Sequence, residues 1–413
     1  MVEKLSAARK YQRAATAKPE QPSLLILNQM AGPMTWELAE DLGELLGSLS
    51  LLTGHPDTLA KGGNQRVKIY SAPAYQRGSF WRRSASWGGY VIRAFFWLLK
   101  MPATTPLLLF SNPPILPWLG WLVKKLRGQP YAVMVHDIYP EVLTRLGALS
   151  ARHPLLGLWR RLNRLAYENA QVVMTLGEAM AANLERQFDS RRTPAGRVEV
   201  IYPWADGEKI KPLPKEENWF ARQHGQLGKL TVMYSGNMGL GHDIETMLEA
   251  AQSLQAEADI HFMFIGAGPK WASVERLTRE RGLRNISLLP WQPEETLPFS
   301  LAAADVALVS LEAGLEDLAI PSKAIYFLAA GAALIVLSHP QSQIAQWAAA
   351  GGSGACVPPG DALSLAQAIL SLQRDPQKLA RLRRQAARQA RERFSRQRMA
   401  PWIAETLKLD KPG

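Results

Sequence analysis

The chain has 413 residues, of which 47% are hydrophobic and 20% charged, values typical of a folded protein and not of a disordered one. This length exceeds one ordinary hydrophobic core, so two domains are expected. A single cysteine, Cys356, excludes a disulfide framework and a cysteine-based zinc site, and it suits a reducing compartment. The formal charge of +12 favours an anionic partner, which could be nucleic acid, anionic lipid or a phosphorylated substrate.

Short apolar runs alternate with amphipathic segments along the chain, a pattern typical of βαβ units and parallel sheets. Residues 1–20 are charged and rich in alanine and lack the apolar stretch of a signal peptide, so a mobile tail is expected there. The first series of predicted strands comprises Leu24–Leu27, Leu49–Thr53, Val67–Tyr70, Leu107–Phe110, Ala132–Val135, Val172–Thr175 and Val198–Ile201.

Proline and charge replace the apolar periodicity in Pro203–Asn218, which predicts a linker. The second series of predicted strands comprises Leu230–Tyr234, His261–Ile265, Ile286–Leu289, Val306–Val309, Leu334–Leu337 and Ala355–Val357. The prediction is an α/β fold of two Rossmann-like parallel-sheet domains, over residues 21–203 and 204–394. Ligands of such domains bind beyond the carboxyl ends of the strands, so the loops that follow strands are the candidate sites.

Three segments bear on membrane or nucleic-acid binding. Pro106–Val123 approaches the roughly 20 apolar residues of a spanning helix, but Asn112-Pro113-Pro114 divides it into a predicted strand, a turn and a helix start. Ser84–Lys100 is predicted as an amphipathic helix with arginines close to tryptophans, which suits a membrane interface as well as a helix that covers a sheet. Lys378–Arg398 is predicted as a solvated basic helix, because no nucleic-acid motif or aromatic stacking run accompanies its arginines.

Two loops of the first domain are candidate sites. Gly32 and Pro33 follow the first strand, where glycine lets a ligand approach the backbone and proline fits the first helical turn; a tight turn explains them equally. His136 and Asp137 follow the fifth strand. His136 could orient a hydroxyl or bind a phosphate. Asp137 could act as a base, fix the imidazole tautomer or cap the turn that begins at Tyr139-Pro140.

The second domain opens with a glycine-rich stretch between a strand and a helix, which predicts backbone N–H groups at 236–241 that hold a phosphate. Its order is G-x-x-G-x-G, and the next strand ends in Gly266-Ala267-Gly268 without an acid for a ribose. Both features argue against a nicotinamide cofactor. The glycines expected to allow close approach of a ligand are Gly236, Gly239, Gly241, Gly266 and Gly268.

An acidic loop follows the strand at 306–309 and contains Glu312, Glu316 and Asp317. Pro321 is then expected to begin a helix, with Ser322 and Lys323 in its first turn. A lysine there opposes the helix dipole unless an anion lies in front of it. Acidic groups for hydroxyls beside a cation for phosphate would suit a nucleotide sugar, although a solvated loop with a surface lysine explains the segment equally.

Five motifs along the chain, in this order, resemble the GT-B fold glycosyltransferases. They are SNPP at 111–114, HDIYPE at 136–141, YSGNMGLGHD at 234–243, Gly-x-Gly at 266–268, and PSK with LAAG at 321–331. Within these glycosyltransferases the chain is similar to the retaining group called family 4 and its colanic-acid and exopolysaccharide biosynthesis branch. The resemblance implies a nucleotide-diphosphate sugar on the C-terminal domain, an acceptor on the N-terminal domain, a cleft between them, and a C-terminal helix at about 395–413 that returns to the first domain.

The chain departs from this family at two places. Leu318 and Tyr326 stand where many members carry two glutamates eight positions apart, so Glu312, Glu316 and Asp317 are the candidate substitutes. Asn237 and His242 lie in the region of the usual arginine and lysine of the phosphate loop, which makes Lys323 the leading cation for the diphosphate.

The resemblance therefore implies a retaining, metal-independent glycosyltransferase that uses a lipid-linked or polysaccharide acceptor, in the cytoplasm or at the inner face of the plasma membrane. His136, Asp137 and Lys323 are the expected catalytic residues, with Gly32 and Pro33 on the acceptor side. No metal, no cofactor besides the donor and no nucleic acid are expected, and an anionic membrane surface is a further expected partner. The alternatives are a non-hydrolysing nucleotide-sugar epimerase and a non-catalytic scaffold that binds membrane or acidic glycan.

Overall fold

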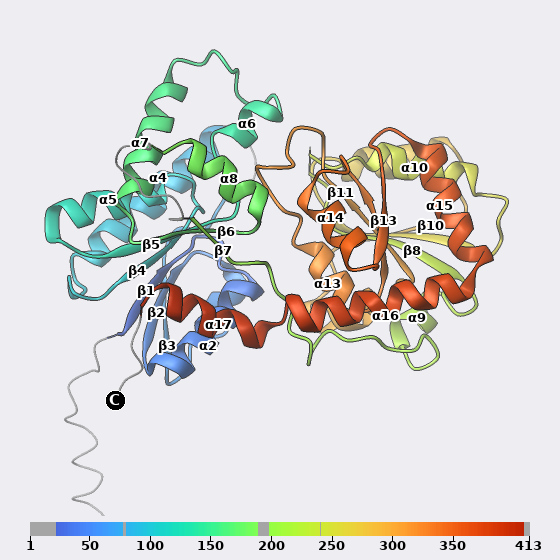
Figure 1. The fold of residues 1–413 in the computed structure, drawn as a ribbon, viewed down its shortest axis with the longest axis horizontal. Coiled ribbons are helices and arrows are strands. Elements are labelled where there is room, and N and C mark those ends of the chain that lie inside the picture. Colours follow the sequence, from blue (N-terminus) through green and yellow to red (C-terminus); the bar gives the residue numbers. More distant parts are fainter. Residues whose placement is uncertain (1–21, 77–79, 189–197, 240, 409–413) are drawn as a thin grey trace, which may run out of the picture. The chain divides into compact units, whose positions relative to one another are not determined.

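The computed structural model describes residues 22–76, 80–188, 198–239 and 241–408. These residues form two sheets of parallel strands with helices on both faces (Figure 1). The first sheet has the order β3-β2-β1-β4-β5-β6-β7 and the second the order β10-β9-β8-β11-β12-β13. The strands are β1 (Leu24–Leu27), β2 (Leu49–Thr53), β3 (Val67–Ser71), β4 (Leu107–Phe110), β5 (Tyr131–Val135), β6 (Val173–Thr175), β7 (Val198–Val200), β8 (Leu230–Asn237), β9 (Ile260–Ala267), β10 (Ile286–Leu289), β11 (Val306–Ser310), β12 (Ala333–Leu337) and β13 (Gly354–Val357).

Amphipathic segments between the strands form the helices that cover the sheets. Those up to β8 are α2 (Pro33–Leu46), α3 (Pro56–Ala60), α4 (Phe80–Leu98), α5 (Leu116–Arg127), α6 (Glu141–Arg145), α7 (Leu155–Asn169), α8 (Glu178–Arg186) and α9 (Trp219–Gln223). Those after β8 are α10 (Ile244–Ser253), α11 (Trp271–Glu280), α12 (Leu297–Ala302), α13 (Lys323–Ala329), α14 (Gln343–Ala350), α15 (Ala362–Arg374), α16 (Pro376–Arg393) and α17 (Arg396–Thr406).

Every predicted strand is present, most with ends within one residue of the prediction. The exception is the end of β8 and β9, which stay paired as far as Asn237 and Ala267. Gly236 and Asn237 therefore lie in β8, and the prediction of a loop from residue 236 onward is wrong for them. Gly266 lies in β9, which extends to Ala267. Pairing continues because glycine backbones can lie close together here: a Cβ on Gly266 would come within 2.1 Å of the Gly236 carbonyl oxygen.

The chain packs into two compact units that do not follow the division between the sheets. The first unit extends to Val133 and includes residues 169–171 and the chain from Leu407; the second comprises residues 134–168 and 172–406. The sheets separate between β7 and β8, a stretch that includes the predicted linker. The domain limits 21–203 and 204–394 remain a prediction. The expected tail at 1–20 lies outside the described residues, as does the end of the expected C-terminal helix at 409–413, whose described part is α17.

The apolar stretch Pro106–Val123 forms β4 and then the beginning of α5, as predicted. Among the residues that the structure describes, no helix is both long enough and apolar enough to cross a membrane.

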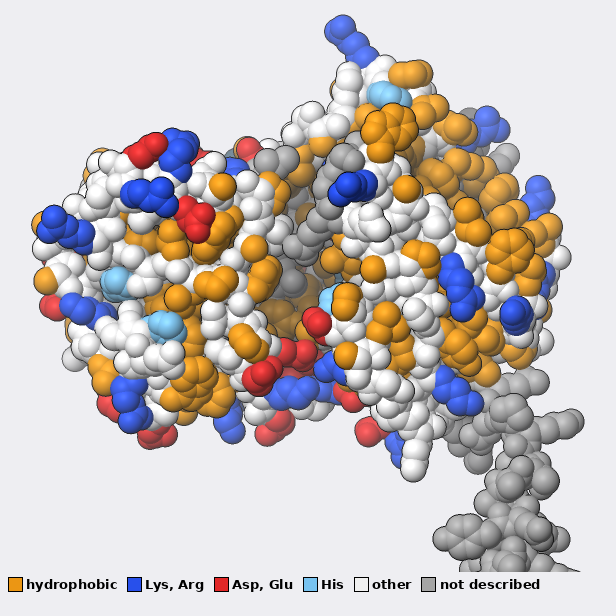
Figure 2. Space-filling view, turned by 180° about the vertical axis from the view of Figure 1, so that it is seen from behind, with side chains coloured by type: hydrophobic (Ala, Val, Ile, Leu, Met, Phe, Trp, Pro, Cys, Tyr) orange, Lys and Arg blue, Asp and Glu red, His pale blue; other side chains and the backbone are white. Residues whose placement is uncertain are grey.

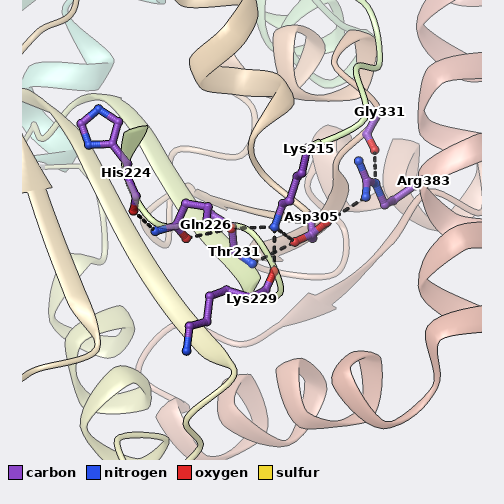
Figure 3. A network of polar contacts seen from close by, with 8 residues as sticks. All are labelled: Lys215, His224, Gln226, Lys229, Thr231, Asp305, Gly331 and Arg383. Atoms are coloured by element: carbon purple, nitrogen blue, oxygen red, sulfur yellow. Dashed lines mark hydrogen bonds and ion pairs between the residues drawn. The ribbon is translucent and has the colours of Figure 1, made fainter. Parts of the chain in front are cut away.

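Asp305 anchors the amino end of the second sheet (Figure 3). Its carboxylate accepts hydrogen bonds from the Lys215 ammonium, from the Thr231 backbone at 2.9 Å and from the Arg383 guanidinium at 2.8 Å. Arg383 also donates to the Gly331 carbonyl oxygen at 3.0 Å. Burial lowers the pKa of Lys215, and the nearby Asp305 carboxylate opposes that shift. Arg383 of the basic helix α16 is thus part of a structural network, at the sheet end opposite to the candidate site.

The second sheet has one place where its strand order reverses. From β8 the chain continues to β9 and β10 on one side, and then to β11 and β12 on the other. Connections leave this point in opposite directions, and ligands of such sheets bind beyond the carboxyl ends of the strands at such a point, here those of β8 and β11.

Candidate functional site

Lys323 and Tyr234 meet at this switch point. Tyr234 is buried near the end of β8, and Lys323 is the first residue of α13. The Lys323 ammonium lies 3.9 Å from the centroid of the Tyr234 ring and donates a hydrogen bond of 2.6 Å to its hydroxyl oxygen. The hydroxyl in turn donates to the Asn237 carbonyl oxygen at 2.8 Å, which ties the lysine to the end of β8.

An ammonium group has three N–H donors. Among the described residues, Tyr234 alone accepts a hydrogen bond from Lys323, so two donors remain for a ligand. Burial lowers the pKa of Lys323 to about 7, because the charged form has lost much of its water. Near pH 7 the group is therefore only about half protonated, and an incoming anion would stabilise its charged form.

Gly236 gives Lys323 the space that it occupies. Its φ is +133°, in the region that favours glycine, and a Cβ there would lie 3.3 Å from both Cε and Nζ of Lys323. On the neighbouring strand end, Gly268 has a φ of +145°, and a Cβ there would lie within 2.6 Å of the Met238 carbonyl oxygen. Room for the Lys323 side chain accounts for Gly236 and close backbone packing accounts for Gly268, in both cases without any ligand.

His242 is an uncharged member of the site. Its Nδ1 lies 3.0 Å from the Ser310 carbonyl oxygen. Because a carbonyl oxygen only accepts, Nδ1 carries the proton and donates, and in the neutral ring Nε2 is an acceptor. Burial lowers the pKa of His242 to about 3, with the positive charge of Lys323 as the next cause. His242 is thus not a cation for a phosphate, and Lys323 supplies the charge here.

The loop between β8 and α10 is held by the cap of that helix. Asp243 accepts from the Thr246 backbone at 3.1 Å, which confirms the expected cap, and its own backbone N–H donates to the Ser310 hydroxyl at 3.1 Å. Gly239 lies beside the Asn237 side chain, whose amide nitrogen would be 3.0 Å from an added Cβ. Leu240, within the predicted phosphate loop, lies outside the described residues.

The structure separates the three acidic candidates. Glu316 accepts from the Gly314 backbone in its own loop at 2.8 Å. Asp317 accepts from Asn183 at 2.7 Å and from Arg186 at 3.3 Å, both in the same compact unit. Glu312 is exposed, and its carboxylate accepts no hydrogen bond from any residue that the structure describes. Glu312 is therefore the carboxylate available to a ligand.

The start of the following helix differs slightly from the prediction. α13 begins at Lys323, so Pro321 precedes it and Ser322 is its N-cap, without a side-chain cap bond. The prediction that Pro321 begins the helix is wrong by two residues, and the prediction that Ser322 lies in its first turn is wrong by one. At the two places of the family's glutamates, Leu318 is buried at 2% exposure and Tyr326 is partly buried.

His136 and Asp137 lie directly after β5. The alternative that Asp137 caps the next turn is wrong, because the N-cap of α6 is Pro140 and has no side-chain cap bond. Burial lowers the pKa of His136 to about 4 and raises that of Asp137 to about 6, so the imidazole is neutral near pH 7. In the same compact unit, the Ile138 backbone donates to the Leu318 carbonyl oxygen at 2.9 Å, which aligns this segment with the acidic loop.

Gly32 and Pro33 begin α2 as predicted, with Gly32 as the N-cap and Pro33 as the first residue. A Cβ on Gly32 would have 4.0 Å to its nearest neighbour, the His55 ring, so packing does not require glycine. The described residues contain no group of three or more His, Cys, Asp or Glu side chains placed to hold a metal ion.

Tyr234 and Ser310 are residues of this site that the sequence pattern does not single out. Both are strand residues with no measurable exposure, and their apolar neighbours make them look like core. The available signal was position: each stands near the carboxyl end of a strand that borders the switch point.

The comparisons with known proteins agree with this geometry. Residues 31–204 match the family described as "Glycosyl transferase 4-like domain", and residues 229–375 match "Glycosyl transferases group 1". WbjE of Pseudomonas aeruginosa, a probable glycosyltransferase, is 30% identical over 259 residues, which span 63% of this chain and 64% of that protein, just under two thirds of its length. WcaI of Escherichia coli K12, named for glycosyl transfer in colanic acid biosynthesis, is 24% identical over 67% of this chain and 69% of that protein.

Among solved structures, HepE of Anabaena in complex with UDP aligns with a TM-score of 0.71 over 93% of this chain and 99% of that chain. At 16% identity this likeness concerns the fold alone. With the two parallel sheets, it confirms the expected GT-B fold.

Proposed function

The chain belongs to the glycosyltransferases of the family 4-like and group 1 type, and we propose that it transfers a sugar to an acceptor. The donor of that sugar would be a nucleotide-diphosphate sugar. The observation that carries the proposal is Lys323, a partly buried ammonium at the switch point with two N–H donors that no described residue uses. A diphosphate has the charge and the oxygen atoms to accept both.

The leaving diphosphate needs stabilisation when the bond to the sugar breaks, because negative charge then develops on it. Lys323, the Ser322 hydroxyl and the backbone N–H groups around Gly239 and Gly241 would supply it, and such electrostatic stabilisation is usually the largest catalytic effect. Asn237, exposed at the end of β8, would contact the same part of the donor. The HepE structures that hold UDP and UDP-glucose support a donor of this class.

For the sugar we propose Glu312, the acidic candidate whose carboxylate is not used by its own loop. A carboxylate accepts hydrogen bonds from the hydroxyl groups of a hexose, as does the neutral Nε2 of His242. Glu316 and Asp317 would hold the loop in place, since both already accept backbone or side-chain hydrogen bonds.

We propose transfer with retention of configuration, without a metal ion, to a lipid-linked or polysaccharide precursor. The leaving phosphate would take the acceptor proton on the same face of the sugar, which needs no protein nucleophile. His136 and Asp137 would orient the acceptor. The expectation that Gly32 and Pro33 contact the acceptor stays a prediction. The similarity to WcaI supports an acceptor of this kind, and the single cysteine supports a cytoplasmic site of action.

A thermal-shift panel of UDP-, GDP-, dTDP- and CMP-sugars tests the proposal, since a true donor raises the melting temperature by mass action. Lys323→Ala should abolish the shift. Lys229→Ala should keep it, because the Lys229 ammonium bonds the Ala258 carbonyl oxygen, well away from the site. A full shift in Lys323→Ala would overturn the phosphate assignment, and no shift with any donor in the wild type would overturn the function.

Once the donor is identified, reactions with and without an acceptor distinguish sugar transfer from two alternative functions. An epimerase converts the donor without any acceptor, so an epimer in that mixture would favour it. The non-catalytic scaffold draws support from Leu318 and Tyr326, which stand where the family has glutamates. Donor binding without transfer to any lipid-linked or glycan acceptor would favour the scaffold.

A further inference from the structure

Helix α4 is apolar on two faces. Its inner face covers the first sheet with Tyr90, Ala94 and Trp97, and the Tyr90 hydroxyl donates to the Leu52 carbonyl oxygen of β2 at 2.8 Å. Its outer face nevertheless carries large apolar side chains with high exposed fractions, namely Trp81 (79%), Ile92 (61%), Phe96 (58%) and Leu99 (47%). A helix that only covers a sheet has a polar outer face, so folding alone does not explain this composition.

Helix α5 extends the same surface. Leu122 and Leu126 are 38% and 61% exposed. The Arg127 guanidinium donates to the Met101 carbonyl oxygen at 2.7 Å and to that of Leu98, which fixes the end of α5 against the end of α4. We call the exposed residues Ile92, Phe96, Leu99, Leu122 and Leu126 the α4–α5 apolar surface.

The charges on the segment that forms this surface have one sign. From Phe80 to Arg127 the sequence contains seven lysines and arginines and neither aspartate nor glutamate. Arg93, Lys100 and Lys125 are exposed, and the Lys125 ammonium lies 5.4 Å from the centroid of the Trp121 ring. In the space-filling view, hydrophobic side chains gather on the right-hand part of the surface with Lys and Arg among them (Figure 2).

An apolar surface bordered by cations and tryptophans matches the boundary between anionic headgroups and acyl chains of a lipid bilayer. A second copy of the chain fits less well, because its α4–α5 surface would bring the same positive charges into contact. Nucleic acid would satisfy the cations but would leave the exposed isoleucine and leucines without a partner.

We propose that the α4–α5 apolar surface docks the protein on an anionic lipid bilayer. Ile92, Phe96, Leu99 and Leu126 enter the headgroup boundary, and Arg93, Lys100 and Lys125 contact lipid phosphates. The binding is peripheral, and it needs neither the donor nor the acceptor of the proposed reaction, so it can fail or hold independently of that function.

Vesicle co-sedimentation with phosphatidylcholine, with and without phosphatidylglycerol, tests the proposal. The wild type should bind the anionic vesicles and bind the neutral ones much less. Phe96→Ser with Leu126→Ser should weaken binding at least about tenfold, given the transfer free energy of two apolar side chains. Arg93→Gln with Lys125→Gln should weaken it by a similar factor and flatten its salt dependence.

The matched control is Leu363→Ser on α15, which changes a leucine with 69% exposure outside this surface. It should leave vesicle binding unchanged, and circular dichroism and melting curves should show every variant folded. Wild-type protein that ignores anionic vesicles would overturn the proposal, as would equal binding by the Phe96/Leu126 variant. A stable dimer that the Phe96/Leu126 variant dissolves would overturn it in favour of a second copy of the chain.

Discussion

The Lys323 ammonium lies over the Tyr234 ring, 3.9 Å from its centroid, and donates to the Tyr234 hydroxyl at 2.6 Å. The two residues are 89 positions apart in the chain. This pair positions a cation of lowered pKa at the switch point of the second sheet and leaves two of its N–H donors for a ligand.

Tyr234→Phe should weaken donor binding about fivefold while the protein stays folded. The ring remains below Lys323, but the lysine loses its acceptor and Asn237 loses its hydrogen bond, each worth about 1 kcal/mol. Isothermal titration with the donor measures the change. Unaltered affinity would show that the hydroxyl does not position Lys323.

Donor affinity should fall as pH rises above about 7. In the free protein burial lowers the pKa of Lys323 to about 7, so the group loses its proton above that pH, whereas a bound diphosphate favours the charged form. Binding then takes up a proton, and affinity drops by up to about tenfold per pH unit. Titrations between pH 6 and pH 9 measure the slope. Lys323→Arg is the control, because arginine stays charged and should remove the dependence on pH.

Lys323→Met should stabilise the free protein at pH 6 even though it abolishes donor binding. The pKa of Lys323 is lower in the folded than in the unfolded state, so its charge disfavours folding below pH 7, and this penalty fades as pH rises from 7 towards 10. We expect a gain of about 1 kcal/mol, or roughly 2–4 °C in melting temperature. A melting temperature below that of the wild type at pH 6 would contradict this account.

Glu312→Gln should lower kcat/KM about tenfold or more, because the uncharged amide is a weaker acceptor for sugar hydroxyls. Asp317→Asn should have a smaller effect, since Asp317 already accepts from Asn183 and Arg186. Initial rates at several donor concentrations separate the two variants. A larger loss in Asp317→Asn would assign the sugar contact to that residue instead.

Gly236→Ala should lower both stability and donor affinity. The backbone there has a φ of +133°, and the new methyl group would lie 3.3 Å from Lys323 Nζ, so a cost of about 1–3 kcal/mol is expected. The control is Gly157→Ala in α7, where a Cβ meets nothing within 4 Å and alanine favours the helix. Melting curves of the two variants should shift in opposite directions.

Asp305→Asn should destabilise the protein by about 3 kcal/mol, because Lys215 and Arg383 lose their common buried partner. Donor affinity should stay near the wild-type value below the melting temperature, since Asp305 lies at the amino end of the sheet. Chemical denaturation and a donor titration on the same sample test both statements.

The succession of strands, both parallel sheets and the loops to search could be predicted from the sequence, because apolar periodicity is a local property. The ends of β8 and β9 could not. The glycine-rich stretch from Gly236 suggests a loop, yet Gly236 remains paired with Gly266 because the two bare backbones approach each other. Because β8 extends to Asn237, the loop predicted to hold a phosphate begins after residue 237 and not at residue 236.

By itself the sequence determined the parallel-sheet architecture and singled out Lys323 as a lysine in an unusual place. Only the tertiary structure decided that Tyr234 is its partner, that His242 is uncharged and that Glu312 is the acid its loop leaves available. Hydrogen bonds and loss of water depend on which distant segments pack together, and neither residue type nor spacing records that packing.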